Sequence, residues 1–583
     1  MWIAYGKARR TSLSATLSVP LIDPLTFHPP HLWQAPLAVK LIDAGIAEGH
    51  WVLLANCHLM ESWLGELDKI IESLPTRKPN KEFRLWLSSA PKDSFPIGIL
   101  QRAIKMTTEP PKGLKANMTR LVNNLSVEKF ESCGKPAKYK KLLYAMCWFH
   151  AVLVDRRKFL HLGWNIPYDF NDSDFEVSEL CLRLYLDEYD QTPWDALRYL
   201  IAEINYGGRV TDDMDRRLMN TYMAQFFCDD AIQTANFKLS SLSSYVIPED
   251  GPLPMYKEVC AGLPAIDRPE AFGQHQNADL ASAITSGNAM LEVITSLQPK
   301  VVDASGMSPQ DMVYGLAGDL ISAMPEPINI YQRLGEGDGT ALHVVLVQEL
   351  QRYNLLLGKI RSSLALVKKG IKGLVVMSPD LDVIYNKLLN GQVPPAWLAT
   401  YPSLKPLASW ARDLLLRWGQ LMEWCEKGPP KVFWLAGFTY PNGFLTALMQ
   451  TEARAVNVSI DSLMWDFPIV NLEEKDVTAP PKEGAYVRGL FLEGAGWNYD
   501  ASNLCEPEPM ELVYNMPMLH FKPIESKKSK AKGMYACPLY LYPLRTGSRE
   551  RPSFMLYIDI KSGAVEPEVW IKRGTALLLA TAE

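Results

Sequence analysis

Three polar residues follow a short apolar run at residues 51–55, which predicts a buried strand ending in Asn56, Cys57 and His58. Enzymes that hydrolyse nucleoside triphosphates carry acidic residues at such a strand tip, where they hold Mg²⁺ and activate water. The neutral amide of Asn56 cannot replace a carboxylate that organises the metal ion. Cys57 and His58 could form a nucleophile and its base, but adjacent residues of a strand point to opposite faces. We therefore predict no catalytic residue at this tip.

A phosphate-binding loop is also missing from the sequence. Such a loop has the pattern GxxxxGK[ST], in which backbone N–H groups contact the phosphates and the lysine neutralises their charge. Gly-Lys occurs at residues 6–7, 134–135 and 358–359, each time without the upstream glycine or the following hydroxyl. The string GEGDGT at residues 335–340 follows no clear strand, so a flexible linker is the better interpretation. No GxSxG string of a serine hydrolase occurs.

Metal sites have equally little support. Asp212, Asp213 and Asp215 stand beside Arg216 and Arg217 and could bind a cation, but they follow a Gly-Gly pair and precede a helix. Helix capping with charge pairing is the favoured interpretation. The nine cysteines form no CxxC pair and no HExxH string occurs, so neither a zinc site nor a disulfide framework is predicted. We expect reduced, partly buried thiols.

The composition is that of a multidomain globular chain. Its 583 residues are 48% hydrophobic and 21% charged, which predicts three or four domains. The net charge of -5 favours neither nucleic acid nor a membrane as a partner, and no apolar run approaches the ~20 residues that span a bilayer. Lys7, Arg9 and Arg10 allow a mitochondrial presequence, but an irregular or incorrectly started N-terminus is the favoured interpretation.

Residues 36–125 predict an α/β domain that positions the polar strand tip. The expected elements are a strand at 51–55, a helix at 61–74 and a strand at 83–91, in a parallel sheet. The preceding string APLAVKLIDAGIAEG predicts a helix with five inward side chains, Leu37, Val39, Leu41, Ile42 and Ile46. Residues 1–35 show no comparable pattern and are expected to be irregular.

Residues 126–240 predict a helical lid. One of its helices places Leu142, Met146, Phe149 and Leu153 on one face, and another begins at Pro193 and ends at residues 207–208. Residues 241–428 predict long helices with an apolar seam spaced by three or four residues, formed by Leu342, Leu346, Leu350, Tyr353, Leu357, Ile360, Leu364 and Val367. An intradomain bundle is favoured over a coiled coil that binds a partner.

Residues 429–583 predict a different architecture. Short β-rich runs such as KVFWLA, AYVRGLFLE, YACPLYLYP, SFMLYIDI and VWIKRGTALLL alternate with prolines and glycines, and one helix occupies residues 441–454. This pattern predicts a small antiparallel β-barrel or sandwich. The fold class is therefore multidomain, with an α/β part, a helical lid, a helical bundle and a C-terminal small β-barrel.

Several long strings resemble a dynein heavy chain. FRLWLSSAPKDSFPIGILQRAIKMTTEPPKGLKANMTRL (83–121), GWNIPYDFNDSDFEVS (163–178) and DALRYLIAEINYGGRVTDDMDRRLM (195–219) are similar to its sixth AAA+ module. IKGLVVMSPDLDVIYNKLLNGQVPPAW (371–397), GPPKVFWLAGFTYPNGFLTALMQTEAR (428–454) and the final WIKRGTALLL (570–579) are similar to its C-terminal domain. The resemblance covers residues 36–583 and is nearest to the axonemal, or ciliary, dyneins.

This resemblance assigns a role to each segment. Residues 36–125 become a remnant of the large AAA+ subdomain, residues 126–240 the small subdomain, and residues 241–428 and 429–583 the helical and barrel parts of the C-terminal domain. Asn56 and Cys57 stand at the positions of the Walker-B acids, and Ser88 stands on the strand that senses the γ-phosphate in active modules. The sixth module of this family does not hydrolyse ATP, so we expect no enzyme activity and no cofactor in this chain. ATP and Mg²⁺ are expected in other modules of a full-length heavy chain, which is a microtubule-motor ATPase.

The resemblance also implies partners and location. Expected partners are the other AAA+ modules and, through the whole complex, intermediate, light intermediate and light chains, with microtubules contacted indirectly. The expected location is the cytoplasm, cytoskeleton and axoneme of a cilium or flagellum. The first strand, phosphate loop and next helix of the module should precede residue 36, and residues 1–35 do not resemble them. The alternatives are therefore a piece of a motor, a gene fragment, or an independent adaptor acting in trans.

Two further expectations concern surfaces. Arg102, Lys105 and Arg209 could reach a neighbour's nucleotide, but ordinary surface electrostatics is the favoured account and we assign them no role. The strands near 51–55 and 83–90 belong to an incomplete sheet, whose exposed surface should make the isolated chain prone to association.

Overall fold

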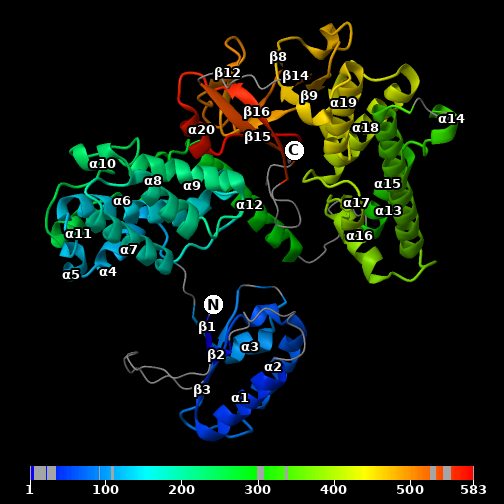
Figure 1. The fold of residues 1–583 in the computed structure, drawn as a ribbon. Helices are drawn as coiled ribbons and strands as arrows, with labels where there is room; N and C mark the ends of the chain where they lie inside the picture. The colour runs from blue at the N-terminus through cyan, green and yellow to red at the C-terminus, as the bar shows by residue number, and fades with distance from the viewer. Residues whose placement is uncertain are drawn as a thin grey trace. The chain divides into compact units, whose positions relative to one another are not determined.

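The computed structural model describes residues 2–5, 21–22, 35–90, 92, 94–106, 110–297, 308–334, 339–525, 533–541 and 553–581. These residues form two compact units, Met1–Pro111 and Lys112–Glu583 (Figure 1). Most of the N-terminal segment with Lys7, Arg9 and Arg10, and most of the GEGDGT string, lie outside the described residues.

The first unit contains a five-stranded sheet in the order β2-β3-β4-β1-β5. The strands are β1 (Trp2–Tyr5), β2 (Leu21–Ile22), β3 (Trp51–Leu54), β4 (Arg84–Ser88) and β5 (Ile104–Met106). β2, β3 and β4 are parallel, because helices cross over between β2 and β3 and between β3 and β4. The strands predicted at 51–55 and 83–91 are parallel, as expected, but β1, from the segment before residue 36, pairs antiparallel with β4 and β5. β1 and β2 also lie within residues 1–35, which we expected to be irregular.

Helices α1 (Ala35–Glu48), α2 (Glu61–Ser73) and α3 (Ile97–Arg102) contribute to one hydrophobic core with this sheet. Strand alternation buries Val52, Leu54, Leu85 and Leu87, as the sequence pattern predicts. Leu37 is 49% exposed, so its predicted inward position is wrong, because Ala38 and Ile42 form the buried stripe of α1. Gly45 lets α1 approach the sheet: a Cβ there would lie 2.8 Å from Val52 Cγ2.

The second unit begins with the predicted helical lid. Its elements are α4 (Leu114–Asn124), α5 (Val127–Glu131), α6 (Pro136–Asp155), η2 (Arg156–Leu162), α7 (Asp172–Glu188), α8 (Trp194–Arg198), the π-helix η3 (Tyr199–Tyr206), α9 (Asp213–Phe226), α10 (Asp229–Gln233), α11 (Leu253–Ala261), η4 (Pro269–Phe272) and α12 (Asn277–Leu297). α6 is buried on all sides from Leu142 to Val154, not only on the predicted face. The lid core continues to Ala278, beyond residue 240, where we expected the lid to end.

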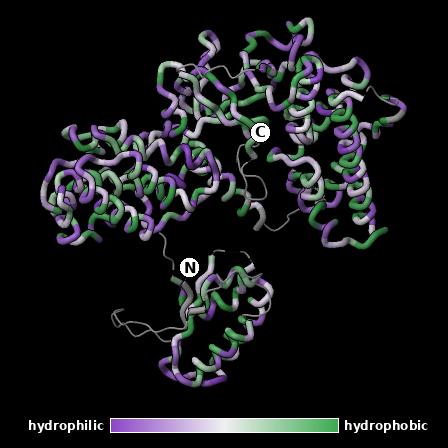
Figure 2. The backbone as a smooth tube through the Cα atoms, viewed as in Figure 1, coloured by the Kyte–Doolittle hydropathy of each residue, from purple (hydrophilic) through white to green (hydrophobic). Residues whose placement is uncertain are grey.

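Further helices follow the lid: α13 (Pro309–Ala323), α14 (Ile330–Leu334), α15 (Ala341–Ile371), α16 (Pro379–Leu389), α17 (Pro395–Leu398) and α18 (Leu407–Lys427). Along α15 the predicted seam is buried from Leu346 to Val367 and packs against α13, α16 and α19. Figure 2 shows hydrophobic and hydrophilic residues alternating along these helices, as expected of an intradomain bundle.

The C-terminal part contains two open five-stranded sheets. One has the path β6-β9-β14-β7, with β8 also paired to β14, and the other has the order β13-β10-β17-β15-β16. Their strands are β6 (Val432–Trp434), β7 (Met464–Asp466), β8 (Ile469–Val470), β9 (Ala485–Arg488), β10 (Phe491–Glu493), β13 (Val513–Asn515), β14 (Met518–Ile524), β15 (Met534–Tyr540), β16 (Phe554–Lys561) and β17 (Ala576–Leu578). β11 (Gly496–Asn498) and β12 (Asn503–Cys505) form a separate pair.

The predicted barrel is not confirmed, because the strands that the structure describes do not close into one. Two helices accompany the sheets, α19 (Pro441–Val456), which the sequence predicted, and α20 (Pro567–Arg573), which it did not. We expected VWIKRGTALLL to be one β-rich run. Its first half is α20 instead, because Pro567 begins a helix and Gly574, with φ 66°, ends it.

Candidate functional site

The tips of β3 and β4 carry the residues that the sequence placed at a nucleotide site; we call Asn56, Cys57, His58 and Ser88 the strand-tip cluster. β3 ends at Leu54, and Asn56 has a left-handed backbone with φ 53° and ψ 42°. This turn starts a short 3-10 helix, η1 (Cys57–Leu59). The argument from strand alternation is therefore wrong in its geometry, since Cys57 and His58 do not lie on a strand.

Cys57 and His58 nevertheless contact different groups. The buried thiol of Cys57 donates to Leu54 O at 3.4 Å, and burial raises its pKa to about 12. His58 Nδ1 accepts the N–H of Ala90 at 3.0 Å, and partial burial together with Lys92 lowers its pKa. A thiol with this pKa stays protonated at neutral pH and is a poor nucleophile.

Ser88 joins the two strand tips. Its Oγ accepts the backbone N–H of Asn56 at 2.9 Å, so the serine on the second strand binds the turn after the first. Such a contact fixes the spacing of the tips without any ligand. The cluster contains no carboxylate to hold Mg²⁺, and Ser88, which accepts the Asn56 N–H, keeps its O–H as a donor. Among the described residues, moreover, no group of three His, Cys, Asp or Glu side chains could hold a metal ion.

The three basic residues that could have reached a neighbour's nucleotide bond within the chain. Arg102 donates to Glu72 at 2.8 Å, Lys105 Nζ to Leu100 O at 2.8 Å, and Arg209 to Asp174 at 2.7 Å. The acidic run also has a structural role. Asp212 caps α9 by accepting the N–H groups of Met214 and Asp215, each at 3.0 Å, as the capping interpretation predicted.

A second constellation lies inside the second unit, between the lid and the C-terminal region from residue 308 onward, which we call the cap. At its centre Arg156 is fully buried at the end of α6. Its guanidinium donates to Gly163 O at 2.8 Å, Leu162 O at 3.1 Å and Phe272 O at 3.2 Å, all in the lid. It also donates to Tyr222 of α9 and to the carbonyl of Lys572, in the last turn of cap helix α20.

This contact suits the charges involved. The carbonyl groups at a helix C-terminus carry partial negative charge, so a buried guanidinium there is favourably placed. Burial lowers the pKa of the neighbouring Lys572, and Arg156 lowers it further, while the Lys572 ammonium donates to Gln225 at 2.8 Å. Gly574 permits the close approach, because a Cβ there would lie 2.7 Å from Leu162 O.

Other polar pairs surround Arg156 and cross between lid and cap; with Arg156 they form what we call the lid–cap joint. His161 Nε2 lies 2.9 Å from Glu493 Oε1, and these side chains are only 11% and 9% exposed. Asn165 donates to the Tyr540 hydroxyl at 2.7 Å. The Asn277 side chain donates to Glu508 O and Glu511 O at 2.9 and 3.0 Å and accepts the N–H of Met510 at 3.0 Å.

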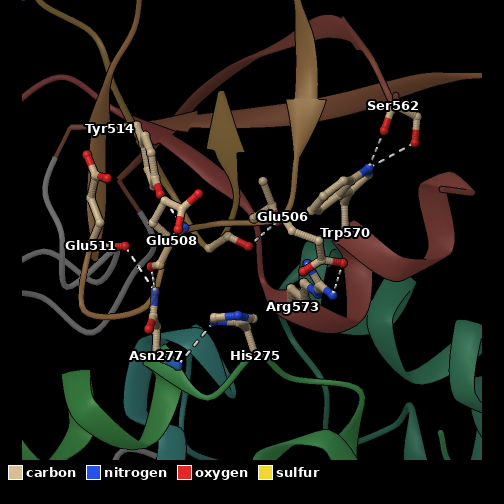
Figure 3. Close-up of polar contacts among 11 residues, drawn as sticks. His275, Asn277, Glu506, Glu508, Glu511, Tyr514, Ser562, Trp570 and Arg573 are labelled. Carbon is tan, nitrogen blue, oxygen red and sulfur yellow. Dashed lines mark hydrogen bonds and ion pairs between the residues drawn. The ribbon is translucent and has the colours of Figure 1, made fainter. Parts of the chain in front are cut away.

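Figure 3 shows Asn277 and His275 next to the cap loop that carries Glu506, Glu508 and Glu511. In the same view Arg573 of α20 forms a bidentate pair with Glu506, with both N···O distances at 2.7 Å. Sequence reasoning missed this joint, because its lid and cap partners lie more than two hundred residues apart. In the sequence, the joint could have been suspected only from single charged or amide residues that stand within otherwise apolar segments.

Comparison with known families accounts for most of the sequence. Residues 33–107 match the dynein heavy chain region D6 P-loop domain, residues 139–278 the dynein heavy chain AAA lid domain, and residues 284–579 the C-terminal domain of the dynein heavy chain. The first of these names a phosphate loop, although the GxxxxGK[ST] pattern does not occur in this sequence.

Individual relatives give the same result. The chain is 56% identical over 554 residues to the dynein-1-beta heavy chain of the flagellar inner arm I1 complex of Chlamydomonas reinhardtii. It is 55% identical over 552 residues to human dynein axonemal heavy chain 2, and 40% identical over 557 residues to mouse dynein axonemal heavy chain 3. Each alignment covers 94% of this chain but only 12–14% of the relative. Because the C-terminal-domain match alone spans half of its residues, the chain belongs to the dynein heavy chain family.

Proposed function

We propose that this chain supplies the ring-closing AAA+ module and the C-terminal cap of an axonemal dynein heavy chain. The observation that carries the proposal is the order of the three family matches along one polypeptide, ending in a cap joined to its lid by buried polar contacts. In this role the chain supports microtubule-based movement of cilia or flagella. Its direct partners are other modules of a heavy chain, and it meets intermediate, light intermediate and light chains through the complex.

We infer that the module does not hydrolyse ATP. Asn56 and Cys57 offer no carboxylate for Mg²⁺, and the Cys57 thiol is buried and donates to Leu54 O. The reaction requires charge neutralisation and a positioned water, which these neutral groups do not supply. Nucleotide chemistry then belongs to other modules of a full-length heavy chain.

The lid–cap joint suggests how such a module acts mechanically. A lid and a cap joined by a buried guanidinium transmit displacement of one to the other, because separating them breaks the bond of Arg156 to Lys572 O and the pairs His161–Glu493 and Asn165–Tyr540. A cap that bridges modules shifts the equilibrium between ring states by contacting one state more strongly than another.

Nucleotide binding and turnover test the chemical part of the proposal. Isothermal titration of the purified chain with Mg·ATP should show no saturable heat, and phosphate release should stay at the buffer rate. The double variant Asn56→Asp, Cys57→Glu restores the acidic pair and should also remain inactive, because no phosphate loop accompanies it. Turnover by the unmodified chain that disappears in Asn56→Ala would contradict the proposal.

A chimera tests the mechanical part. Residues 36–581 would replace the corresponding region of the Chlamydomonas reinhardtii relative, and inner-arm assembly and microtubule gliding would be measured. We expect both to be retained, and gliding to slow when the chimera carries Arg156→Met. A chimera that assembles with full ATPase activity but cannot glide would refute the proposed role. The adaptor alternative predicts instead that the free 583-residue chain binds a heavy chain lacking this region.

A further inference from the structure

A groove of about 630 Å³ lies between α12 and one face of the sheet that contains β13, β10 and β17. Its α12 wall includes Ala278, Ala281 and Ile284, and its sheet wall includes Phe491, Val513 and Leu578. This volume is in the range of sites that bind ligands in proteins. The groove is not part of the strand-tip cluster, but three residues of the lid–cap joint, His161, Asn277 and Glu493, also line it.

One rim of the groove is the edge strand β13. β13 pairs on one side with β10, and no other described strand pairs with its outer side. Met516 N donates to Leu490 O at 2.9 Å, which places Met516 and Tyr514 among the residues that bond to β10. In an antiparallel ladder the alternate residues turn their N–H and C=O groups away, so those of Val513 and Asn515 face outward. On this outer edge the Tyr499 hydroxyl donates to Asn515 O at 2.7 Å.

The loop that leads into β13 is held in place. Asn277 bonds to the backbone of Glu508, Met510 and Glu511, and the Tyr514 hydroxyl accepts the N–H of Glu508 (Figure 3). A loop fixed by four hydrogen bonds loses little conformational freedom when a ligand binds against it. The edge and its rim are therefore pre-organised.

The rim combines apolar and acidic side chains. Ile284 on α12 is 45% exposed and Met510 is 79% exposed, and further along α12 Met290, Leu291, Val293 and Ile294 are exposed as well. The Glu508 and Glu511 side chains are exposed, and no described residue forms an ion pair with either. Arg573 does not neutralise them, because it binds Glu506 with both terminal nitrogens. The rim therefore carries excess negative charge beside an apolar surface.

We propose that this groove binds an extended segment of a partner polypeptide as an added strand beside β13. The outward N–H and C=O of Val513 and the outward N–H of Asn515 bond to the backbone of that segment, as in other cases of strand addition, while Asn515 O keeps its bond to the Tyr499 hydroxyl. Alternate side chains of an added strand point to one face, so its apolar residues enter the groove against Ile284. Lysine or arginine residues in the segment face Glu508 and Glu511.

Selection from a library of random dodecapeptides tests this proposal with the intact chain. Peptides enriched on the wild-type protein should alternate apolar residues and contain lysine or arginine, and their dissociation constants follow from fluorescence anisotropy. Val513→Pro removes the outward N–H at an edge position that tolerates proline, and should weaken binding by about tenfold or more. The matched control Val513→Ala keeps the N–H and should change binding less than about threefold.

Two further measurements distinguish strand addition from non-specific binding of the peptides. Ile284→Ser should weaken binding of the same peptides, and Glu508→Gln with Glu511→Gln should weaken it and reduce its salt dependence. Hydrogen exchange should show slower exchange of the Val513 and Asn515 amides when peptide is bound. Circular dichroism and melting of each variant confirm that the fold is kept.

Three outcomes would overturn the proposal. One is a selection that enriches no peptide on the wild-type protein beyond those enriched on the Val513→Pro variant. Another is equal binding of the enriched peptides to the folded Val513→Pro variant and the wild-type protein. The third is a concentration-dependent dimer in sedimentation that Val513→Pro abolishes, because a second copy of this polypeptide would then occupy the edge.

Discussion

The strand-tip cluster and the lid–cap joint are both built from polar side chains, but they use them differently. At the strand tips, neutral groups bond over short separations in sequence, as Ser88 does with Asn56, 32 residues away. At the joint, charged groups bond across hundreds of residues, as Arg156 does with Lys572 and His161 with Glu493. Burying a charge without partners destabilises the folded protein by several kcal/mol. The joint is therefore stable only when every partner is in place.

The strand-tip cluster therefore holds a local turn in place, whereas the lid–cap joint holds two distant parts of the chain together. A substitution at the strand tips, such as that of Ser88, removes one hydrogen bond. The joint loses several at once, because Arg156 serves five acceptors in the lid and the cap. We therefore expect mutational sensitivity to concentrate at the joint.

The largest effect is expected for Arg156→Met. The substitution keeps most of the side-chain volume but removes the guanidinium donors of the carbonyls Gly163 O and Lys572 O, which should destabilise the second unit by roughly 3–5 kcal/mol. Urea unfolding followed by tryptophan fluorescence measures the change. Arg157→Met is the matched control, since Arg157 pairs at 2.8 Å with an almost fully exposed Asp169 and should cost less than about 1 kcal/mol. Equal stability of the two variants would refute the special role of the joint.

A pH-dependent effect of comparable size is expected from His150 in the lid core. Burial, with a smaller effect of Arg120, lowers its pKa from 6.5 to about 4, and Nδ1 lies 2.8 Å from the Tyr206 hydroxyl. The unfolded protein therefore binds a proton near pH 6.5 that the folded protein accepts only near pH 4. Stability from this group is full above pH 6.5 and falls as the pH decreases, by roughly 3 kcal/mol at pH 4.

His150→Asn isolates this contribution. The variant is expected to be less stable at pH 8 but to lose less stability than the wild-type protein between pH 6.5 and pH 4, as measured by urea unfolding at each pH. His58→Asn at the strand tip serves as the comparison and should alter the pH slope less, since His58 is only partly buried. Parallel pH curves for wild type and His150→Asn would contradict the assignment.

At the strand tips, Ser88→Ala should have a moderate effect. It removes the acceptor for the Asn56 N–H, and the loss of one partly buried hydrogen bond should cost about 1 kcal/mol. Thr76→Ala is the control, because it removes an exposed hydroxyl of similar size that bonds only to Ser73 O. Hydrogen exchange of the Asn56 amide is the direct readout, and an unchanged exchange rate in Ser88→Ala would contradict the contact.

The smallest effect is expected within the cap, beside the joint, for Glu506→Gln. Arg573 lowers the pKa of Glu506 through a bidentate hydrogen bond, but the carboxylate is 59% exposed and solvent screens the pair. The substitution should cost less than about 1 kcal/mol, and the cost should shrink further in 0.5 M salt. A loss of stability as large as that of Arg156→Met would contradict this ranking, because it would show that the exposure of a side chain does not set the size of the effect.

Much of the fold could be predicted from the sequence, because it depends on local periodicity. The seam of α15, the capping of α9 by Asp212 and the start of α19 at Pro441 follow from patterns within one element. The absence of the GxxxxGK[ST] pattern and the neutral Asn56 are likewise properties of the sequence itself. The family also follows from the sequence, since it is carried by long strings that need no coordinates.

Other features arise only when distant segments meet. Periodicity could not show that β1 runs against β4, that the C-terminal sheets stay open, or that residues 567–573 form a helix beside the lid. It also could not show that one hydrophobic core joins the helical and sheet parts of the cap across residue 428, where we expected a boundary.

The lid–cap joint illustrates the physical reason. The sequence by itself determined which residues carry charge and which segments are apolar, because these are properties of single residues and their neighbours. Only the tertiary structure decided that Arg156 would be buried against the end of α20, since two of the carbonyls that accept from its guanidinium lie 116 and 416 residues away. A buried charge is stable only in the complete set of its partners, and that set exists only in the folded protein.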